Sequence, residues 1–308
     1  MTSARRQLLA DLALLVVALV WGSTFVMVKD AVSAFPVFAF LTIRFTFAAL
    51  SLAPLVAIRT RQRAASDPAP WRSRLTPART VGPALAGLAL FAGYGFQTAG
   101  LQLTTPAKAG FITGLSVVIV PVIAALALRQ RLPRAAWLGV ALATAGLALL
   151  SLQRDLAVER GDLLVFFCAL AFAAQILLTG ILARRYDPLR FTLVEVVVVA
   201  VLSGAISLLF EEPSWPSLRV LGAALFTGVL ATSAAFGIQT AAQRFTSSAH
   251  TALIFATEPV FAALFSFLLI GELLTARQIF GAALILAGML VAEVRVPFRR
   301  KASPAGQA

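Results

Sequence analysis

The sequence has one cysteine, Cys168, and one histidine, His250, among 308 residues. A single cysteine cannot form an intrachain disulfide, and a metal site needs several cysteine, histidine or acidic ligands at close spacing. The chain also lacks a phosphate-binding glycine loop and a nucleophile followed at motif spacing by a base. We therefore expect no catalytic residues, no metal and no cofactor, and we do not expect transport driven by ATP.

Charged residues are scarce as well, at 13% of the chain, whereas hydrophobic residues make up 60% and the mean hydropathy is +0.91. A soluble globular protein has about 25% charged and about 45–50% apolar residues. So few polar groups cannot cover a water-soluble body of this size, and lipid must surround most of the chain. The net charge of +13 does not indicate nucleic-acid binding, because the basic residues cluster between apolar runs, as charges that orient membrane helices do.

Ten apolar runs approach the roughly 20 residues that a helix needs to cross lipid. Open strands cannot cross the hydrocarbon, and these runs are too long for the strands of a barrel, so they predict helices. The first run has no A-x-A-like cleavage site, which predicts a retained span and not a signal peptide. The predicted spans are 8–29, 34–58, 80–101, 106–128, 134–152, 162–183, 188–210, 217–241, 247–271 and 275–294.

The basic residues also predict the orientation. With the amino terminus in the cytoplasm, nineteen Lys and Arg residues fall in cytoplasmic segments and six on the opposite side. Cytoplasmic loops carry such an excess. The expected fold is therefore an all-α polytopic protein of the cell inner membrane, with ten transmembrane helices, both termini cytoplasmic and a basic cytoplasmic tail at 295–308.

The second half of the chain repeats the first. At an offset of 142 positions, residues 95–99 (GFQTA) align with 237–241 (GIQTA) without a gap, and two glycine pairs in the fifth and tenth spans also align. An offset of 151–152 relates Asp11 to Asp162 near the start of each half.

We therefore predict two five-helix repeats, 8–152 and 162–294. Because five is odd, the second repeat enters the membrane from the opposite side. Inverted repeats of this kind allow a secondary transporter to open one site to either side in turn.

Several motifs occur in the order and spacing of a known family. Residues 21–25 (WGSTF) in the first span are followed by Pro36 and Arg44, and Glu258-Pro259 in the ninth span by Gly271-Glu272. Over nearly the whole chain they resemble the two EamA modules of the drug/metabolite transporter superfamily, closest to the bacterial aromatic amino acid exporter branch. The resemblance implies a ten-helix carrier that exports small metabolites. The halves depart from equivalence at Gln130, which stands where the second half has Glu272, and at Pro121, one turn later than Pro259.

Polar side chains within a span are costly in lipid, so they are expected to face the interior of the bundle. Gln97 and Gln239 coincide at the 142-residue offset, and an aromatic residue precedes each by three positions on the same helical face. A pocket with aromatic walls and few polar groups is typical of small-molecule sites. The alternative is that the glutamines join helices and the rings pack in the core or face lipid. The expected substrate-binding residues are Trp21, Thr24, Tyr94, Gln97, Phe111, Gln175, Phe236 and Gln239.

Four ionisable residues are expected to gate the path or couple it to an ion: Arg44, Lys108, His250 and Glu258. Glu258 precedes Pro259, which can kink a helix and free a carbonyl group, so a site for a proton or a substrate amine is expected there. The alternative is a structural carboxylate paired with Arg44 or Lys108. Lys108 and His250 coincide at the 142-residue offset and are expected at opposite mouths of the path; snorkelling of Lys108 and packing of His250 are the alternatives.

For two ionisable residues within the predicted spans, a structural role is the alternative to a role in transport. Arg44 lies well inside the second span, too deep to snorkel easily, and pairs structurally with a carboxylate or with helix-end carbonyl groups if it does not act in transport. Glu195, in the seventh span, has no matching acid in the second. It is expected either to join helices by a hydrogen bond in its protonated form or to belong to a site.

The leading hypothesis is a secondary transporter that exports small metabolites by alternating access, with amino acids, including aromatic ones, as cargo. A broad-specificity drug or quaternary-amine exporter is the alternative, favoured if Glu258 faces the cavity within an aromatic cage. An integral-membrane enzyme or sensor is a remote alternative. The expected partners are a small-molecule substrate (an amino acid or related metabolite) and membrane lipid, with no nucleic acid, and the chain is expected to act as a monomer.

Overall fold

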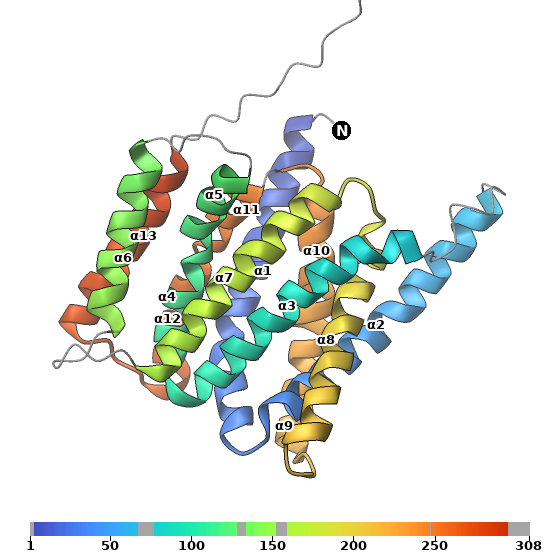
Figure 1. Ribbon diagram of the computed structural model, residues 1–308, viewed down its shortest axis with the longest axis horizontal. Helices are drawn as coiled ribbons and strands as arrows, with labels where there is room; N and C mark the ends of the chain where they lie inside the picture. Colours follow the sequence, from blue (N-terminus) through green and yellow to red (C-terminus); the bar gives the residue numbers. More distant parts are fainter. Residues whose placement is uncertain (1–2, 67–76, 128–133, 152–158, 247, 295–308) are drawn as a thin grey trace, which may run out of the picture.

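The computed structural model describes residues 3–66, 77–127, 134–151, 159–246 and 248–294, and the regular structure within these ranges is helical (Figure 1). The predicted tail at 295–308 lies outside the described residues, and so does Gln130. The elements are α1 (Ser3–Ser33), α2 (Val37–Ser66), α3 (Pro77–Leu103), α4 (Pro106–Gly114), α5 (Ser116–Ala127), α6 (Arg134–Ser151), α7 (Arg160–Leu182), α8 (Pro188–Phe210), α9 (Leu218–Gly228), the π-helix η1 (Val229–Ala234), α10 (Ala235–Ala242), α11 (Ser248–Phe255), α12 (Glu258–Ile270) and α13 (Ala276–Val294).

Eight helical stretches among the described residues are long and apolar enough to cross a membrane. Three of them join consecutive elements: α4 with α5, α9 with η1 and α10, and α11 with α12. Two shorter apolar stretches, Trp137–Leu150 and Ala276–Val291, lie in α6 and α13. The prediction of an all-helical, multi-pass membrane protein is confirmed. The crossing of all ten segments and the side of each terminus stay predictions.

Prolines and capping side chains set several helix starts. Thr105 precedes Pro106, the first residue of α4, and its side chain accepts a hydrogen bond from the backbone N–H of the first turn. Asp187 does the same before Pro188 at the start of α8. Proline suits this position because the first N–H groups of a helix have no partner within it. α12 ends at Gly271, whose φ of 67° is the left-handed conformation that glycine adopts most readily.

The fourth and ninth predicted spans are each broken near the middle. α4 ends at Gly114 and α5 begins at Ser116, whereas α11 ends at Phe255 and α12 begins at Glu258. Ser116 and Glu258 coincide at the 142-residue offset, so the two breaks are related by the repeat. The break at Glu258 has Pro259 in the first turn of α12, as the expected kink requires. Within a membrane, such breaks are tolerated only where protein or water surrounds the freed backbone groups.

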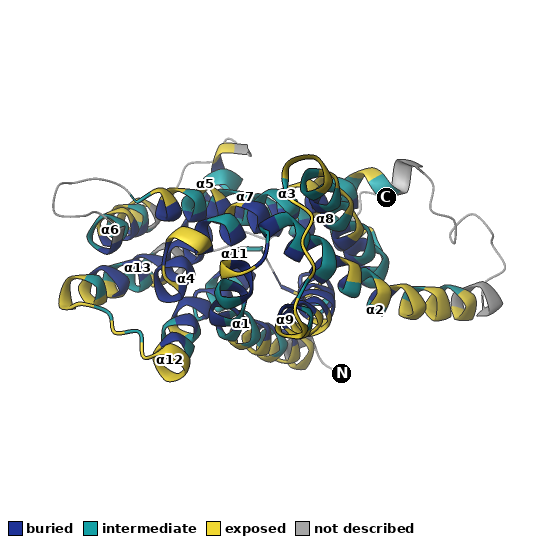
Figure 2. Ribbon diagram, turned by 90° about the horizontal axis from the view of Figure 1, so that it is seen from below, coloured by how far each residue is buried: buried dark blue, intermediate teal, exposed yellow. Residues whose placement is uncertain are grey.

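The main helix contacts join the two halves of the chain and not neighbours within one half. α2 packs on α8, α3 on α7, α4 on α12 and α6 on α13, while α1 contacts both α10 and α12. Figure 2, turned by 90°, shows the helices in two rows, with α7, α3 and α8 along one and α12, α1 and α9 along the other. The two halves therefore interdigitate around one core.

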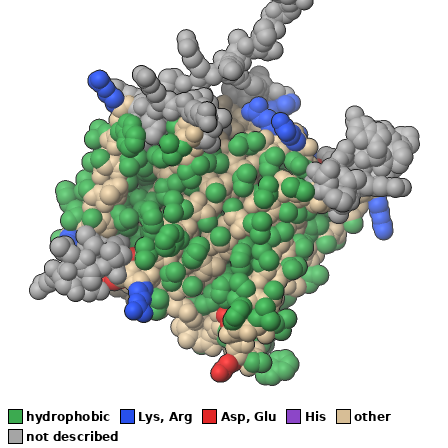
Figure 3. Space-filling model, in the orientation of Figure 1, with side chains coloured by type: hydrophobic (Ala, Val, Ile, Leu, Met, Phe, Trp, Pro, Cys, Tyr) green, Lys and Arg blue, Asp and Glu red, His purple; other side chains and the backbone are tan. Residues whose placement is uncertain are grey.

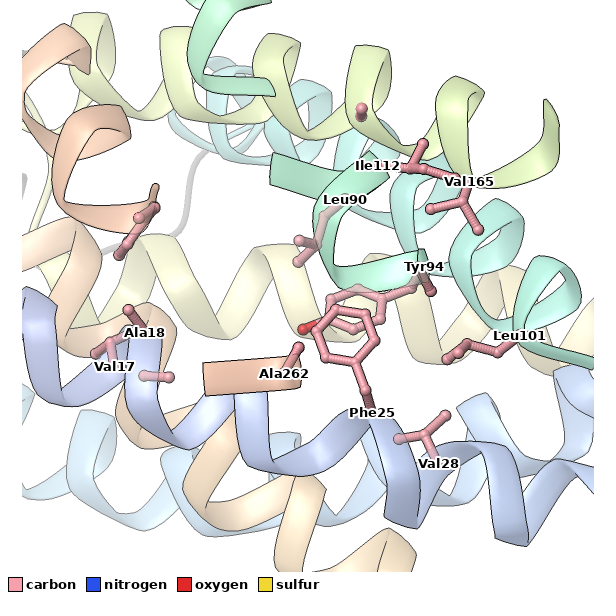
Figure 4. Close-up of a cluster of buried hydrophobic side chains, with 14 of the residues drawn as sticks. Val17, Ala18, Phe25, Val28, Leu90, Tyr94, Leu101, Ile112, Val165 and Ala262 are labelled. Atoms are coloured by element: carbon pink, nitrogen blue, oxygen red, sulfur yellow. The ribbon is translucent and has the colours of Figure 1, made fainter. Parts of the chain in front are cut away.

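The outside of the bundle is largely apolar. Figure 3 shows one face covered by hydrophobic side chains, with charged side chains near its margins. Leu208, Leu209 and Phe210 at the end of α8 are among the exposed apolar residues. A soluble monomer rarely exposes so large an apolar surface, whereas lipid accommodates it. The interior is apolar as well, and Figure 4 shows core side chains from α1, α3, α4, α7 and α12.

Glycines bring α6 and α13 into backbone contact. A Cβ atom on Gly146 would lie 2.5 Å from the carbonyl oxygen of Gly281, and one on Gly288 would lie 2.6 Å from that of Gly139. The 142-residue offset relates Gly139 to Gly281 and Gly146 to Gly288, so exchange of the halves turns one of these contacts into the other. Close backbone approach supplies the van der Waals contact on which helix association in lipid depends. The small-residue faces of these helices are therefore used within the chain.

This contact predicts the effect of a single methyl group. We expect Gly146→Ala to lower the free energy of unfolding by about 1–3 kcal/mol, the usual cost of overpacking. Gly222 in α9 is the matched control, because a Cβ there would meet nothing within 4 Å. Gly222→Ala should be neutral or raise stability through helix propensity. Thermal unfolding of both variants in the same detergent tests this, and equal shifts for the two would contradict it.

Candidate functional site

A cavity lies inside the bundle at the level of the two broken helices. The empty space around it, counted out to its mouth and including open solvent, is about 640 Å³. Both halves of the chain contribute to the wall, and most of the residues are apolar or uncharged. The wall is formed by Trp21, Thr24, Phe25, Val28, Arg44, Tyr94, Gln97, Leu101, Thr113, Gly114, Ser116, Phe172, Gln175, Ile176, Phe236, Gln239, Phe255 and Glu258.

All the predicted site residues except Phe111, Lys108 and His250 lie in this wall. Phe111 is buried but belongs to the apolar core. It is not part of the wall, although Thr113 and Gly114 of the same helix are. The prediction of Phe111 as a wall residue therefore differs from its position in the structure, because the rotation of α4 could not be read from the sequence.

Arg44 of α2 is the cation of the wall and is 2% exposed. Its Nε donates a hydrogen bond to Thr232 Oγ1 at 3.1 Å, and its Nη2 donates to the Tyr94 hydroxyl at 3.1 Å. The guanidinium carbon also lies 4.4 Å from the centroid of the Tyr94 ring. Among the described side chains no carboxylate lies within ion-pair distance of Arg44. Its partners are neutral, so the charge itself is not compensated within the protein.

The π-helix η1 supplies polar partners on this side of the cavity. Thr232 accepts from Arg44 and donates to the carbonyl oxygen of Thr227 at 2.9 Å. The indole Nε1 of Trp21 donates to the carbonyl oxygen of Ala231 at 2.7 Å. π-Helical turns are frequent at functional sites because the wider turn changes the partners of the backbone. A Cβ atom on Gly228, just before η1, would clash with the backbone of Arg44, so glycine permits this approach.

Glu258 is the carboxylate of the wall and the first residue of α12, directly after the break. It is 8% exposed, and the described residues give it no hydrogen-bond or ion-pair partner. The structural pairing with Arg44 or Lys108 is therefore not formed. The first turn of a helix favours a negative charge, which partly explains why a carboxylate is placed here.

Aromatic rings form much of the remaining wall. Trp21 lies 5.1 Å from Phe236 and 4.8 Å from Phe255 between ring centroids, and Tyr94 lies 5.3 Å from Phe172. Phe172 and Phe255 were not predicted. For Phe172 a signal existed: it follows Trp21 by 151 positions, the offset that relates Asp11 to Asp162. The same offset relates Thr24 to Gln175, another pair in the wall.

Lys108 lies outside the wall, in a cluster that joins the two halves of the chain. Its Nζ lies 2.6 Å from Glu159 Oε2 and 2.7 Å from Asp162 Oδ2, and the Thr104 hydroxyl donates to Asp162 Oδ1 at 2.5 Å. The side chain of Lys108 is 6% exposed, so it does not reach for the surface. Lys29 of α1 donates to the carbonyl oxygen of Thr104 at 2.5 Å, at the end of α3, where a cation is favoured. We call Lys108, Glu159, Asp162 and Thr104 the Lys108 cluster.

His250 lies outside the wall as well, and its Nε2 is 3.2 Å from Asp11 Oδ1. The contact is an ion pair when the imidazole is protonated. The offsets relate Asp11 to Asp162 and His250 to Lys108, so this pair corresponds to the Lys108 cluster. Asp11 and Lys29 are about 27 Å apart along α1 at the helical rise per residue. The Asp11–His250 pair and the Lys108 cluster therefore lie at opposite ends of α1, as expected for the two mouths of a path.

The cavity wall combines charged groups, amides and aromatic rings. Among the residues that the structure describes, no group of His, Cys, Asp and Glu side chains could hold a metal ion. The wall offers one cation, one carboxylate, three glutamine side chains and several aromatic rings. Such a set can hold a small molecule that carries charges of both signs beside an apolar part.

Comparisons with known proteins agree on the family. The sequence profile of the EamA-like transporter family matches residues 8–152 and 159–293. An uncharacterized transporter of Archaeoglobus fulgidus is 34% identical over 291 residues, which cover 94% of this chain and 88% of that protein. The uncharacterized transporter YyaM of Bacillus subtilis is 27% identical over 213 residues, covering 64% of this chain and 68% of that protein.

A solved structure shares the fold. Its TM-score is 0.66 at 22% identity, and the similarity covers 92% of this chain and 96% of that one. Its title, "Crystal structure of protein", gives no activity. Neither of the two relatives is named for a substrate, so the resemblance to the aromatic amino acid exporter branch stays a prediction.

The Lys108 cluster predicts a stability difference between two ion-pair sites. We expect Lys108→Met to lower the free energy of unfolding by about 3–5 kcal/mol, because the Asp162 carboxylate, whose side chain is 2% exposed, loses its ion pair with Lys108. Arg219 is the matched control: its Nε lies 2.8 Å from Asp30, but the two side chains are 80% and 41% exposed. Arg219→Met should cost about 0–1 kcal/mol. Denaturation in one detergent checks both, and similar losses would show that burial of the cluster does not matter.

Proposed function

The chain belongs to the EamA-like transporter family, and we propose that it is a secondary carrier of small zwitterionic metabolites, in the first place amino acids, including aromatic ones. The chain is a multi-pass membrane transporter, and both relatives are named as transporters. The proposal concerns the cargo and the mechanism: the central cavity binds the cargo and opens to each side of the membrane in turn.

One observation carries the choice of cargo. The cavity wall holds Arg44 and Glu258, and the described residues give neither of them a partner of opposite charge. A buried charge without a counter-ion is costly, so a ligand that brings both charges gains from both. An amino acid offers its carboxylate to Arg44 and its ammonium to Glu258. The rings of Trp21, Phe236 and Phe255 favour an apolar or aromatic side chain between them.

The aromatic wall also keeps the second candidate, a quaternary-amine or drug exporter, open to test. Glu258 beside several rings is the arrangement that a quaternary ammonium would use. Arg44 disfavours this candidate. Its guanidinium repels a cationic ligand, and such a ligand brings no anionic group to pair with Arg44. The zwitterion uses both charges of the wall, and the quaternary amine uses one.

Alternating access is supported by the way in which the halves of the chain meet. Exchange of the halves maps the helix contacts onto one another: α2 with α8 and α6 with α13 are their own counterparts, α4 with α12 corresponds to α11 with α5, and α3 with α7 corresponds to α10 with α1. Both helix breaks and both end contacts, Lys108 with Asp162 and His250 with Asp11, follow the same exchange. A two-fold relation of this kind supports inverted repeats around one site.

The inner membrane and export are the remaining parts of the proposal. Nineteen basic residues on one side of the predicted spans against six on the other favour cytoplasmic termini. Export is what the resemblance to amino acid exporters implies. The driving force is left to the gradients across the membrane, since the chain carries no motif for ATP.

Transport in proteoliposomes tests the cargo. We expect saturable uptake of labelled phenylalanine, and weaker uptake of phenethylamine and 3-phenylpropionate, which lack the carboxylate and the ammonium respectively. A hydrogen-bonded charge contributes about 1.5–3 kcal/mol, so each missing group should raise KM about tenfold to a hundredfold. Arg44→Met should raise KM for phenylalanine but not for phenethylamine. Glu258→Gln should raise it for phenylalanine but not for 3-phenylpropionate.

The control variant is Glu212→Gln, an exposed carboxylate in the loop after α8, which should leave all three cargoes unchanged. The panel also contains other amino acids and a quaternary ammonium, tetraethylammonium. If no amino acid shows saturable flux, the proposed cargo is wrong. If tetraethylammonium is carried better than any amino acid, the second candidate replaces the first.

A further inference from the structure

Glu195 of α8 is a second buried carboxylate, outside the cavity wall. It is 0% exposed, its Oε1 accepts a hydrogen bond from Gln175 Nε2 at 2.8 Å, and its Oε2 has no protein partner among the described residues. No arginine, lysine or histidine of the described chain forms an ion pair with it. A carboxyl group kept in this position has a task that an apolar residue could not perform, since an unpaired buried polar atom is destabilising by itself.

The first consequence concerns the orientation of Gln175. Both hydrogens of its Nε2 are used, one by Glu195 Oε1 and one by Thr179 Oγ1 at 3.0 Å. Glu195 Oε1 accepts from this nitrogen, so the amide presents its nitrogen to Glu195 and its oxygen to the other side. Gln175 Oε1 accepts from Gln239 Nε2 at 3.1 Å. Glu195 thereby also sets the direction of the Gln239 amide.

The same direction follows from the far end of the chain of amides. Gln243 Nε2 donates to the carbonyl oxygen of Ile176 at 3.2 Å, and a backbone carbonyl can only accept. Gln243 therefore turns its Oε1 toward Gln239, whose Nε2 donates to it at 3.5 Å. The partners at the two ends of the chain of amides thus agree on one orientation. Both hydrogens of the Gln239 amide are used, and its Oε1 is left without a protein partner.

Gln239 is a wall residue of the cavity, and so is its repeat counterpart Gln97. Gln97 Nε2 donates to Thr113 Oγ1 at 3.2 Å, and the described residues give its Oε1 no partner. The two repeat-related amides thus each have an oxygen without a hydrogen-bond partner among the described residues. Gln239 uses both of its N–H groups, so its amide offers only an acceptor and suits the ammonium end of a zwitterion.

We propose that Glu195 is a positioning residue that fixes the amides of Gln175 and Gln239, so that the wall offers Gln239 Oε1 as an acceptor to a cargo ammonium that has N–H donors. The inference rests on the proposed transport of zwitterions and deepens it. A primary ammonium has three N–H donors for the acceptors that Gln239, Gln97 and Glu258 bring to the wall. A trimethylammonium group of equal charge has no hydrogen to donate and gains only from Glu258 and the rings.

Transport selectivity is the first test. Wild-type protein in proteoliposomes should carry phenylalanine with a KM at least tenfold lower than that of its N,N,N-trimethyl analogue. Glu195→Met removes the acceptor with little change of volume. It should raise KM for phenylalanine about tenfold, leave the trimethyl analogue unchanged and keep the maximal rate within twofold. Glu195→Gln still offers an oxygen to Gln175 and should restore most of the difference between the two cargoes.

A merely structural role would lower transport of both cargoes together, and that result overturns the proposal. So does a Glu195→Gln variant that behaves like Glu195→Met, or a Glu195→Met variant that keeps the selectivity of the wild type.

The amides can also be followed without any cargo, which separates this inference from the proposed function. In protein labelled with ¹⁵N-glutamine, Glu195→Met should shift the side-chain amide signals of Gln175 and of Gln239, although Gln239 does not touch Glu195. The signal of Gln97 is the internal control and should stay in place. Shifted amides without amino acid flux would refute the zwitterion carrier and leave the positioning role standing. An unshifted Gln239 refutes the positioning role even if amino acids are carried.

Discussion

A guanidinium buried without a carboxylate is the constraint on which the centre of the molecule depends. Burial of an isolated ion costs several kcal/mol even after relaxation. Arg44 is kept in place by neutral groups instead: the Tyr94 hydroxyl, the face of the Tyr94 ring and the Thr232 hydroxyl. Each of these groups has requirements of its own. Tyr94 is held edge-on by Phe45 and Phe172, and Thr232 needs the π-helical turn after Gly228, where a side chain would clash with the backbone of Arg44. α2, α3 and η1 are therefore positioned by a charge that none of them neutralises.

At the ends of the bundle, in contrast, charged side chains lie beside side chains of opposite charge. Lys108 forms ion pairs with Asp162 and Glu159. His250 lies beside Asp11 and forms an ion pair with it when the imidazole is protonated. These contacts join the first half of the chain to the second. Ion pairs thus join the halves at both ends, whereas the described residues give the two ionisable residues of the cavity wall, Arg44 and Glu258, no partner of opposite charge. A binding site requires this division, because only an unpaired group gains from a ligand.

Much of this could be predicted from the sequence, and the limit has a physical reason. Helices, multiple spans and inward polar residues follow from the cost of exposing polar groups to lipid, which acts on each residue separately. Contacts depend in addition on the rotation of each helix about its axis. Thr113 lies in the wall and Phe111 does not, although both are in α4.

Pairings between distant segments show the same limit. One offset relates Asp11 to Asp162 and another relates Lys108 to His250, but neither states that Lys108 meets Asp162. That pairing comes from the way in which the halves interdigitate. Phe172 is a different case: the repeat pointed to it through Trp21, and the signal was available in the sequence.

The unpaired charges also connect binding to movement. Closing an empty cavity would enclose Arg44 and Glu258 as two charged groups in a medium of low dielectric constant, which is costly. A zwitterion supplies both counter-charges, so a loaded cavity can exclude water at lower cost. A ligand can favour the closed state only by as much as it binds that state better. A ligand with a single charge leaves one wall ion unpaired and favours closure less. Under the proposed function, the cargo is therefore selected at the closing step as well as at binding. The amides that Glu195 aligns increase this selectivity. Their unpaired oxygens are costly to enclose unless the cargo brings N–H donors.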